Sequence, residues 1–181
     1  MIQLSDGAAF DFTRPTVPSI EVIASSLAKI CRFVGHTKDF YSVAQHSVYV
    51  SHLVPAQYAL AALLHDASEA VLGDCSSPLK QMLPDFRHLE YLVQLEINEH
   101  YCPIAADANC QLAVRAADLQ MLAAERRDLM PKDDPDGVWT WVEREVTPAP
   151  FTVRPWSWKT AEIMFLERYR EVRREVPGRA A

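Results

Sequence analysis

The fold of this chain depends on the stretch Ala61-Ala62-Leu63-Leu64-His65-Asp66-Ala67-Ser68-Glu69-Ala70. It is an apolar, helix-forming run that becomes ionisable where His65 and Asp66 stand side by side, and Glu69 follows one helical turn after the histidine. An unpaired buried charge is costly, so this pair needs either solvent or partners. Two interpretations are open: an amphipathic helix with an exposed His-Asp pair, or a metal site. Ligands elsewhere in the chain would decide between them.

The composition is that of an ordinary globular protein. The 181 residues suffice for one domain with its own core, and hydrophobic and charged contents of 49% and 23% are typical of a soluble fold. A net charge of -6 argues against a partner such as a nucleic-acid polymer, which would require a basic face. A small anionic substrate stays compatible with this charge, because its site needs only a few local cations.

Targeting signals and thiol chemistry point to the cytoplasm. The N-terminus has no basic region followed by an apolar one, and no run approaches the ~20 apolar residues of a membrane span. We therefore expect no signal peptide and no membrane association. The four cysteines form no C-x-x-C pair and are interpreted as reduced thiols. The expected location is the cytoplasm, or the host cytoplasm if a phage encodes the protein.

Helical periodicity dominates the chain and predicts an all-α bundle in a single domain, residues 1–181. A small hairpin is expected in residues 1–12, around Asp6-Gly7. Helices are expected at about 19–32, 42–53, 55–73, 86–101, 110–129, 138–146 and 157–174, with a polar turn at 74–78. The ligand-bearing core is expected at about 19–130. A segment rich in Pro and Trp and the C-terminal helix follow at 131–181, where the tail after Pro177 is expected to fray.

Two details of side-chain direction follow from the helical spacing. Residues Val43, His46, Val50 and Leu53 fall on one face at steps of three and four, so His46 should point into the core, whereas His52 should face solvent. In the last helix we expect the inward residues to be Ile163, Leu166 and Tyr169. The four tryptophans, Trp139, Trp141, Trp156 and Trp158, favour a role in the core or in a subunit interface over a base-stacking wall.

Four ionisable residues are expected on the buried sides of three core helices: His46, His65, Asp66 and Asp118. Each one alone has an ordinary explanation, since a single core histidine is more often a hydrogen-bonded structural residue and a single helical aspartate is more often solvated. Together they supply two imidazoles and two carboxylates. This mixture suits one divalent ion, such as Mn, Fe, Co, Ni or Zn, and also Mg, with positions left open for water and substrate.

The order of these residues resembles the H…HD…D ligand pattern of the HD-domain phosphohydrolase superfamily. The stretch Tyr41-Ser42-Val43-Ala44-Gln45-His46-Ser47 is similar to the first ligand helix of its small bacterial and phage members. Residues 63–70 with Gly73-Asp74 are similar to their HD-x-x-E-x-x-x-GD segment, and Arg115-Ala116-Ala117-Asp118 resembles the last ligand. The resemblance covers about residues 27–127 and implies an HD-type helical bundle. The most similar members act on nucleotides, as 5′-deoxynucleotidases or as phage triphosphohydrolases that cleave dATP.

The resemblance implies hydrolysis of a phosphate by a metal-bound hydroxide that attacks phosphorus in line. Glu69, four residues after His65, is the candidate general acid or base, or else a carboxylate that orients an imidazole. Asp74 belongs to the site by resemblance, where it would contact the substrate sugar or the leaving oxygen; the alternative is a plain turn residue.

Cations for the substrate phosphate are expected at Arg32, His36 and Lys80, which flank the ligand helices. The pair Arg32-Phe33 resembles the Arg-aromatic pair with which nucleotide-acting members bind phosphate and sugar. Phe33 stands where the bacterial deoxynucleotidase pattern has Trp, so sugar and base preference stay open, as do the native metal and the choice between mono- and triphosphate.

The sequence leaves three classes of function to compare. The first is a metal-dependent phosphohydrolase of a (deoxy)nucleotide, and the second is a catalytically silent metal- or nucleotide-binding regulator on the same fold. The third, a helical interaction module with coincidental ionisable residues, is disfavoured by the co-occurrence of the four candidate ligands. The resemblance also implies a homo-oligomer, a dimer or larger.

Overall fold

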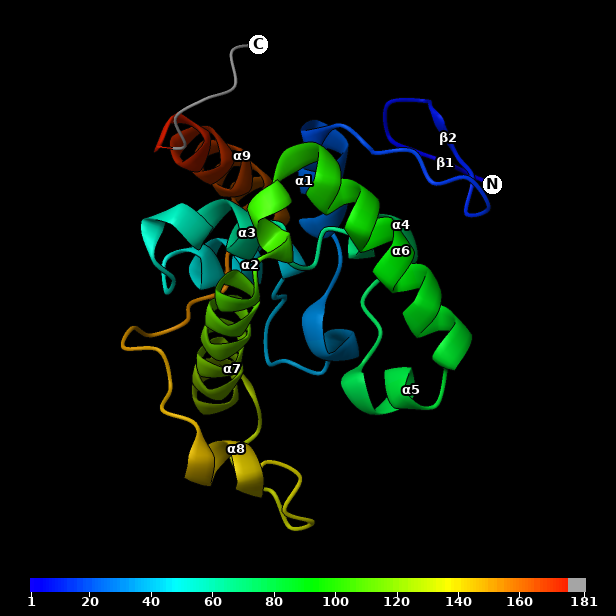
Figure 1. Cartoon of the computed structure of the whole chain (residues 1–181). Coiled ribbons are helices and arrows are strands. Elements are labelled where there is room, and N and C mark those ends of the chain that lie inside the picture. The colour runs from blue at the N-terminus through cyan, green and yellow to red at the C-terminus, as the bar shows by residue number, and fades with distance from the viewer. Residues whose placement is uncertain (176–181) are drawn as a thin grey trace.

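The computed structural model describes residues 1–175 and confirms an all-α fold with a small N-terminal hairpin (Figure 1). The hairpin pairs β1 (Ile2–Gln3) with β2 (Ala9–Phe10) in antiparallel register, Ile2 opposite Phe10. The α-helices and the short 3₁₀ helices, the latter marked η, follow in chain order: α1 (Ile20–Leu27), η1 (Arg32–Gly35), α2 (Val43–Ser51), η2 (Ala56–Tyr58), α3 (Ala59–Leu63), α4 (Glu69–Leu72), α5 (Ser77–Gln81), α6 (Pro84–Tyr101), η3 (Pro103–Ala106), α7 (Ala108–Leu129), α8 (Thr140–Glu145) and α9 (Trp158–Glu175). The predicted fraying after Pro177 lies outside the described residues.

Helix α2 lies in the middle of the molecule, in contact with α3, α7 and α9 (Figure 1). The Ser42 hydroxyl caps it by accepting a hydrogen bond from the Gln45 amide at 3.2 Å, the usual role of a serine at a helix start. Val43 and Val48 join one hydrophobic cluster, and Val50 joins a second one. The helix is therefore covered on nearly every side, and any polar side chain that it carries must find partners inside the protein.

The prediction of one long helix at 55–73 is wrong. The chain instead forms η2, α3 and α4, and turns at residues 64–68 separate α3 from α4. The break is held from another helix. On α6, the Gln94 side chain donates to the Leu64 carbonyl at 2.8 Å and accepts from the Ser68 amide at 3.0 Å. A side chain 26 to 30 residues away thus satisfies backbone groups that a continuous helix would have paired within itself.

Three further differences concern helix limits and faces. Helix α1 ends at Leu27 rather than near Arg32, and the prediction of a polar turn over 74–78 is wrong at its end, because α5 begins at Ser77. In α9 the expected inward position of Ile163 is wrong, because this side chain is 56% exposed, while Phe165 is fully buried in the core. Leu166 and Tyr169 are half-buried at the edge of that core, so the inward face of α9 is rotated from the expected one.

The four tryptophans do not form one cluster. Trp156 packs beside the core with its ring 5.2 Å from that of Tyr49, as expected for a core residue. Trp139 is half-buried, whereas Trp141 and Trp158 are exposed. In residues 1–175, no helix combines the length and the apolar character that crossing a membrane requires.

Candidate metal centre

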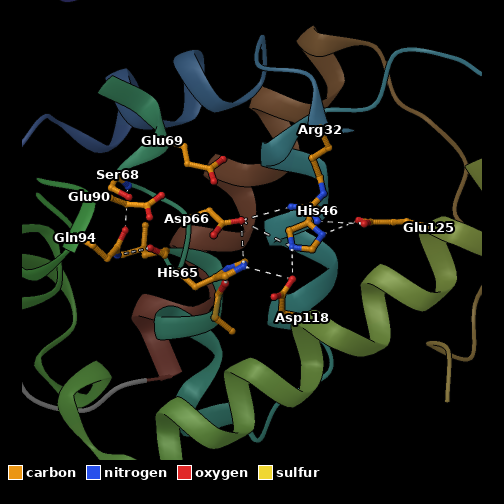
Figure 2. A network of polar contacts seen from close by, with 12 residues as sticks. Arg32, His46, His65, Asp66, Ser68, Glu69, Glu90, Gln94, Asp118 and Glu125 are labelled. Atoms are coloured by element: carbon orange, nitrogen blue, oxygen red, sulfur yellow. Dashed lines mark hydrogen bonds and ion pairs between the residues drawn. The ribbon is translucent and has the colours of Figure 1, made fainter. Parts of the chain in front are cut away.

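His46 lies on α2 and is completely buried, as the spacing of its apolar neighbours predicted. Its Nδ1 lies 2.6 Å from Oε1 of Glu125. Its Nε2 faces the other way, 3.1 Å from Oδ1 of Asp118 and 3.9 Å from Oδ2 of Asp66 (Figure 2). One nitrogen of the ring is thus anchored, and the other is directed at two carboxylates.

His65 and Asp66 lie in the turn that follows α3 rather than on a helix. The His65 Nδ1 donates to the carbonyl of Ala62 at 2.8 Å, which directs Nε2 toward Oδ2 of Asp66, 3.2 Å away. One ligand atom each from His46, His65 and Asp66 lie within 4.8 Å of one another. The helix break at residues 64–68 therefore brings the adjacent His and Asp to the same point.

Asp118 reaches this group from α7, which packs against α2 through buried Ala117 and Met121. Its Oδ1 lies 3.1 Å from Nε2 of His46 and 4.0 Å from Nε2 of His65. The side chain is 40% exposed, more than the other three, so it borders the open side of the group. The structure brings together all four residues predicted as metal ligands (Figure 2).

The donor atoms fit a divalent cation. Within residues 1–175, the buried Nε2 atoms of His46 and His65 have no hydrogen-bond partner, although carboxylate oxygens lie 3.1 and 3.2 Å from them. Nitrogens that approach carboxylates without hydrogen-bond geometry are suitably placed to share a cation with them. Two imidazoles and two carboxylates suit several first-row metals and do not select one.

The charges around the group favour a bound cation. Burial and the Arg32 cation act to lower the pKa of His46, but the carboxylates of Glu125 and Asp118 outweigh them and raise it to about 9. Burial acts to raise the pKa of Asp66, but the adjacent imidazoles and Arg32 hold it well below its usual range. The surroundings therefore favour positive charge at the point where the four side chains meet.

Glu69 and Lys80 lie together beside the centre. Glu69 begins α4, and its buried Oε2 has no hydrogen-bond partner in residues 1–175. The Lys80 Nζ lies 3.9 Å from Oε1 of Glu69 and makes a close ion pair with Glu90 at 2.6 Å. Burial and the carboxylates of Asp66 and Asp74 raise the pKa of Glu69 to about 10, so it holds a proton at neutral pH.

Asp74 follows Gly73, whose positive φ of 80° ends α4 and turns the chain. Burial raises the pKa of Asp74, and the charges of Arg32 and Asp66 also act on it. The side chain is thus half-buried within electrostatic reach of the centre. Whether Asp74 contacts a substrate stays a prediction.

The predicted phosphate-binding residues have different surroundings. Arg32, in η1, is almost buried: its guanidinium lies 3.6 Å from Asp66, 3.3 Å from Glu125 and over the ring of Phe33. Phe33 also meets Trp139 edge to face. His36 is exposed at the end of η1, and within the described residues its side chain makes no hydrogen bond or ion pair with the four donors.

Glu125 is the site residue that sequence reasoning missed. It is fully buried on α7, and it accepts a hydrogen bond from the Tyr41 hydroxyl at 2.8 Å on the same oxygen that lies next to His46. The available signal was spacing: Glu125 follows Asp118 by seven residues, two helical turns along the same face. Its neighbours Arg126, Arg127 and Asp128 are all charged, and such a charged run is typical of a helix end that faces solvent.

Fold and site together define an all-α protein with a candidate His/carboxylate metal centre. No family model matches the chain. It is 42% identical over 153 residues to the uncharacterized protein YfdR of Escherichia coli strain K12, a match that covers 84% of this chain and 83% of YfdR. The chain therefore belongs to the same family as YfdR. It is also 34% identical over 129 residues to an uncharacterized protein of Rhodobacter capsulatus, covering 64% of this chain and 66% of that protein.

Proposed function

We propose that the chain is a divalent-metal-dependent phosphohydrolase of the HD-domain superfamily that acts on a (deoxy)nucleotide. The substrate is either a dNMP, as for a 5′-deoxynucleotidase, or a dNTP such as dATP, as for a triphosphohydrolase. The observation that carries the proposal is the convergence of His46, His65, Asp66 and Asp118, with both imidazole Nε2 atoms buried and without a hydrogen-bond partner in the described residues.

These four residues would hold the ion. A divalent ion lowers the pKa of coordinated water from 15.7 to about 7 and polarises a phosphoryl oxygen. Beside it, the Glu69 carboxyl is placed to hold or transfer a proton during bond cleavage, because it is buried and one of its oxygens has no partner in residues 1–175. Lys80, next to Glu69, supplies positive charge for a phosphate in a protein that is acidic overall.

Arg32 has less capacity to bind a substrate phosphate than a surface arginine would have, because its guanidinium already lies between the carboxylates of Asp66 and Glu125. Its charge nevertheless stands at the edge of the metal centre, where a phosphate would arrive. Arginine binds phosphate through two parallel N–H groups, and Arg32 can turn one edge to the substrate while the other edge stays on Glu125. The half-buried ring of Phe33, which packs against this guanidinium, would supply an aromatic contact for a sugar or base.

The test is turnover by purified protein supplied with Mn²⁺, Co²⁺ or Mg²⁺ and a panel of dNMPs, dNTPs and ribonucleotides. Chromatography of the products distinguishes orthophosphate from tripolyphosphate. Glu69→Gln should keep its metal and lose roughly 10²- to 10⁴-fold in turnover. His65→Ala should lose metal and turnover, whereas His52→Ala, at the exposed end of α2, is the matched control and should keep both.

The outcomes separate the alternatives. Protein that binds metal but hydrolyses none of these nucleotides refutes the proposed activity and favours a catalytically silent regulator that binds metal or nucleotide. A His65→Ala protein that keeps both metal and activity refutes the ligand assignment. Light scattering on the same preparations tests the homo-oligomer that the resemblance implies.

A further inference from the structure

A buried carboxylate stands behind the metal centre, and the proposed reaction does not use it. Glu125 lies on α7, on the side of His46 opposite the other donors (Figure 2). One of its oxygens, Oε1, lies 2.6 Å from Nδ1 of His46 and 2.8 Å from the Tyr41 hydroxyl. The other, Oε2, lies 3.3 Å from the guanidinium of Arg32. Oε1 is thus hydrogen-bonded, whereas Oε2 makes the ion pair with Arg32 and has no hydrogen-bond partner in residues 1–175.

We propose that Glu125 is a positioning residue that holds His46 with its proton on Nδ1 and its Nε2 lone pair directed at the metal. A neutral imidazole donates from one nitrogen and accepts at the other, and an ionised carboxylate can only accept. The contact with Glu125 therefore places the proton on Nδ1. Once a metal has replaced the proton on Nε2, the Nε2 lone pair points toward the oxygens of Asp66 and Asp118.

The second imidazole of the centre is held in the same way. His65 donates from Nδ1 to the backbone carbonyl of Ala62 at 2.8 Å, which leaves Nε2 for the metal. A histidine that binds a metal is usually oriented by such a bond on its other nitrogen, and removing the partner typically costs roughly 10- to 100-fold in metal affinity or activity. His46 differs in that its partner is a side chain, which a substitution can remove.

Glu125 also acts on a third donor through Arg32. The Arg32 guanidinium extends from Glu125 to Asp66, 3.6 Å away, so the position of the arginine depends on the carboxylate behind His46. Glu125 is fully buried, and the guanidinium of Arg32 lies 3.3 Å from its Oε2; this contact favours the ionised carboxylate. One carboxylate on α7 thus orients His46 directly and Asp66 through an ion pair.

The competing explanation is that Glu125 only neutralises Arg32 and stabilises the core. Glu125→Gln distinguishes the two, because it keeps the shape and an acceptor oxygen but removes the charge. Tyr41→Phe removes a single hydrogen bond to the same oxygen and keeps the ring. Asp128→Asn is the matched control, since Asp128 lies one turn further along α7 and pairs with Arg127 rather than with the donors.

The experiment titrates the metal-stripped proteins with Co²⁺ against a competing chelator, with the visible absorption of bound Co²⁺ as readout. Glu125→Gln should bind Co²⁺ at least roughly tenfold more weakly, Tyr41→Phe by a smaller factor, and Asp128→Asn as tightly as the natural protein. Zn²⁺-loaded protein with ¹⁵N-labelled histidine gives a second readout. The His46 proton should appear on Nδ1, strongly downfield, and should move upfield in Glu125→Gln as the charged acceptor is lost.

The inference rests on the metal centre of the proposed function but not on hydrolysis. Unchanged Co²⁺ affinity and an unchanged Nδ1 proton in Glu125→Gln, in a protein whose natural form binds Co²⁺, would overturn the positioning role and leave the phosphohydrolase proposal standing. If Glu125→Gln does not fold, the same two results in Tyr41→Phe overturn it. Weaker binding by Glu125→Gln with a shifted proton, in a protein that hydrolyses no nucleotide, supports the inference and refutes the activity. A natural protein that binds no Co²⁺ refutes both.

Discussion

Phe165→Ala should destabilise the protein strongly, because Phe165 anchors α9 in the core. Its side chain is 0% exposed and belongs to the same hydrophobic cluster as residues of α1, α2 and α3. Removing a buried phenylalanine side chain costs about 3–5 kcal/mol through lost burial and the cavity left behind. In a chain of this length each kcal/mol lowers Tm by about 2–4 °C, so the expected fall is roughly 6–20 °C.

The matched control is Ile163→Ala, two residues earlier on the same helix. Ile163 is 56% exposed, so its truncation should change the free energy of unfolding by less than about 0.5 kcal/mol. Urea denaturation followed by circular dichroism measures both variants, and equal m-values would confirm that the same unfolding transition is compared. A larger loss in Ile163→Ala than in Phe165→Ala would show that α9 packs through the face expected from the sequence, and would refute the placement described above.

Three further predictions concern metal, strain and acid. Co²⁺ at 100 times its Kd should stabilise the native state by about 2.7 kcal/mol and raise Tm by roughly 5–10 °C in a thermal scan. EDTA should reverse this rise. A Tm that changes with neither Co²⁺ nor EDTA would contradict the metal centre. Val34, 66% exposed at φ 54°, occupies a left-handed conformation that costs a β-branched residue roughly 1–2 kcal/mol. Glycine would relieve this strain, but its greater freedom in the unfolded chain offsets part of the gain. Val34→Gly should therefore raise the free energy of unfolding measured in urea by about 0.5–1 kcal/mol. A lower free energy of unfolding would count against this strain. The hydrogen bond from Arg127 lowers the pKa of Asp128. The ionised Asp128 therefore stabilises the fold fully above the pKa of about 4 that an aspartate has in the unfolded chain. This stabilisation is lost as pH falls through the lower pKa of Asp128 in the folded protein. Asp128→Asn should therefore be less stable than the natural protein at pH 7, with a difference that shrinks below about pH 4 in pH-dependent denaturation; a constant difference would refute this.

His46 and Asp118 could be predicted because each stands in a local pattern that the tertiary structure obeys. His46 shares a helical face with Val43 and Val50, and all three are buried. The serine before this helix caps it as its chemistry requires. Asp118 is next to buried Ala117 and one turn before buried Met121, so the apolar face of α7 carried it to the right side. For these residues, periodicity alone implied the direction of the side chain.

The remaining features depend on contacts between distant parts of the chain. Residues 59–72 have the composition of one continuous helix, and the break within them is stabilised by Gln94, which only the fold brings near. Glu125 stands in a charged stretch whose local appearance is that of a solvent-facing helix end. Its burial depends on Arg32 and Tyr41, which are more than 80 residues earlier in the sequence. Local patterns cannot weigh such partners, because the energy that favours them appears only after the helices pack.

The distribution of the donors along the chain has a consequence for biosynthesis. His46, His65 and Asp66 leave the ribosome early, whereas Asp118 follows 52 residues after Asp66, and Glu125 later still. At typical elongation rates of about 5–20 residues per second, this delay lasts roughly 3–10 seconds. A nascent chain in this interval offers an ion three donors without the carboxylate that orients His46. Loading of the proposed metal centre would therefore follow the emergence of α7 and its packing against α2, late in the folding of each newly made molecule.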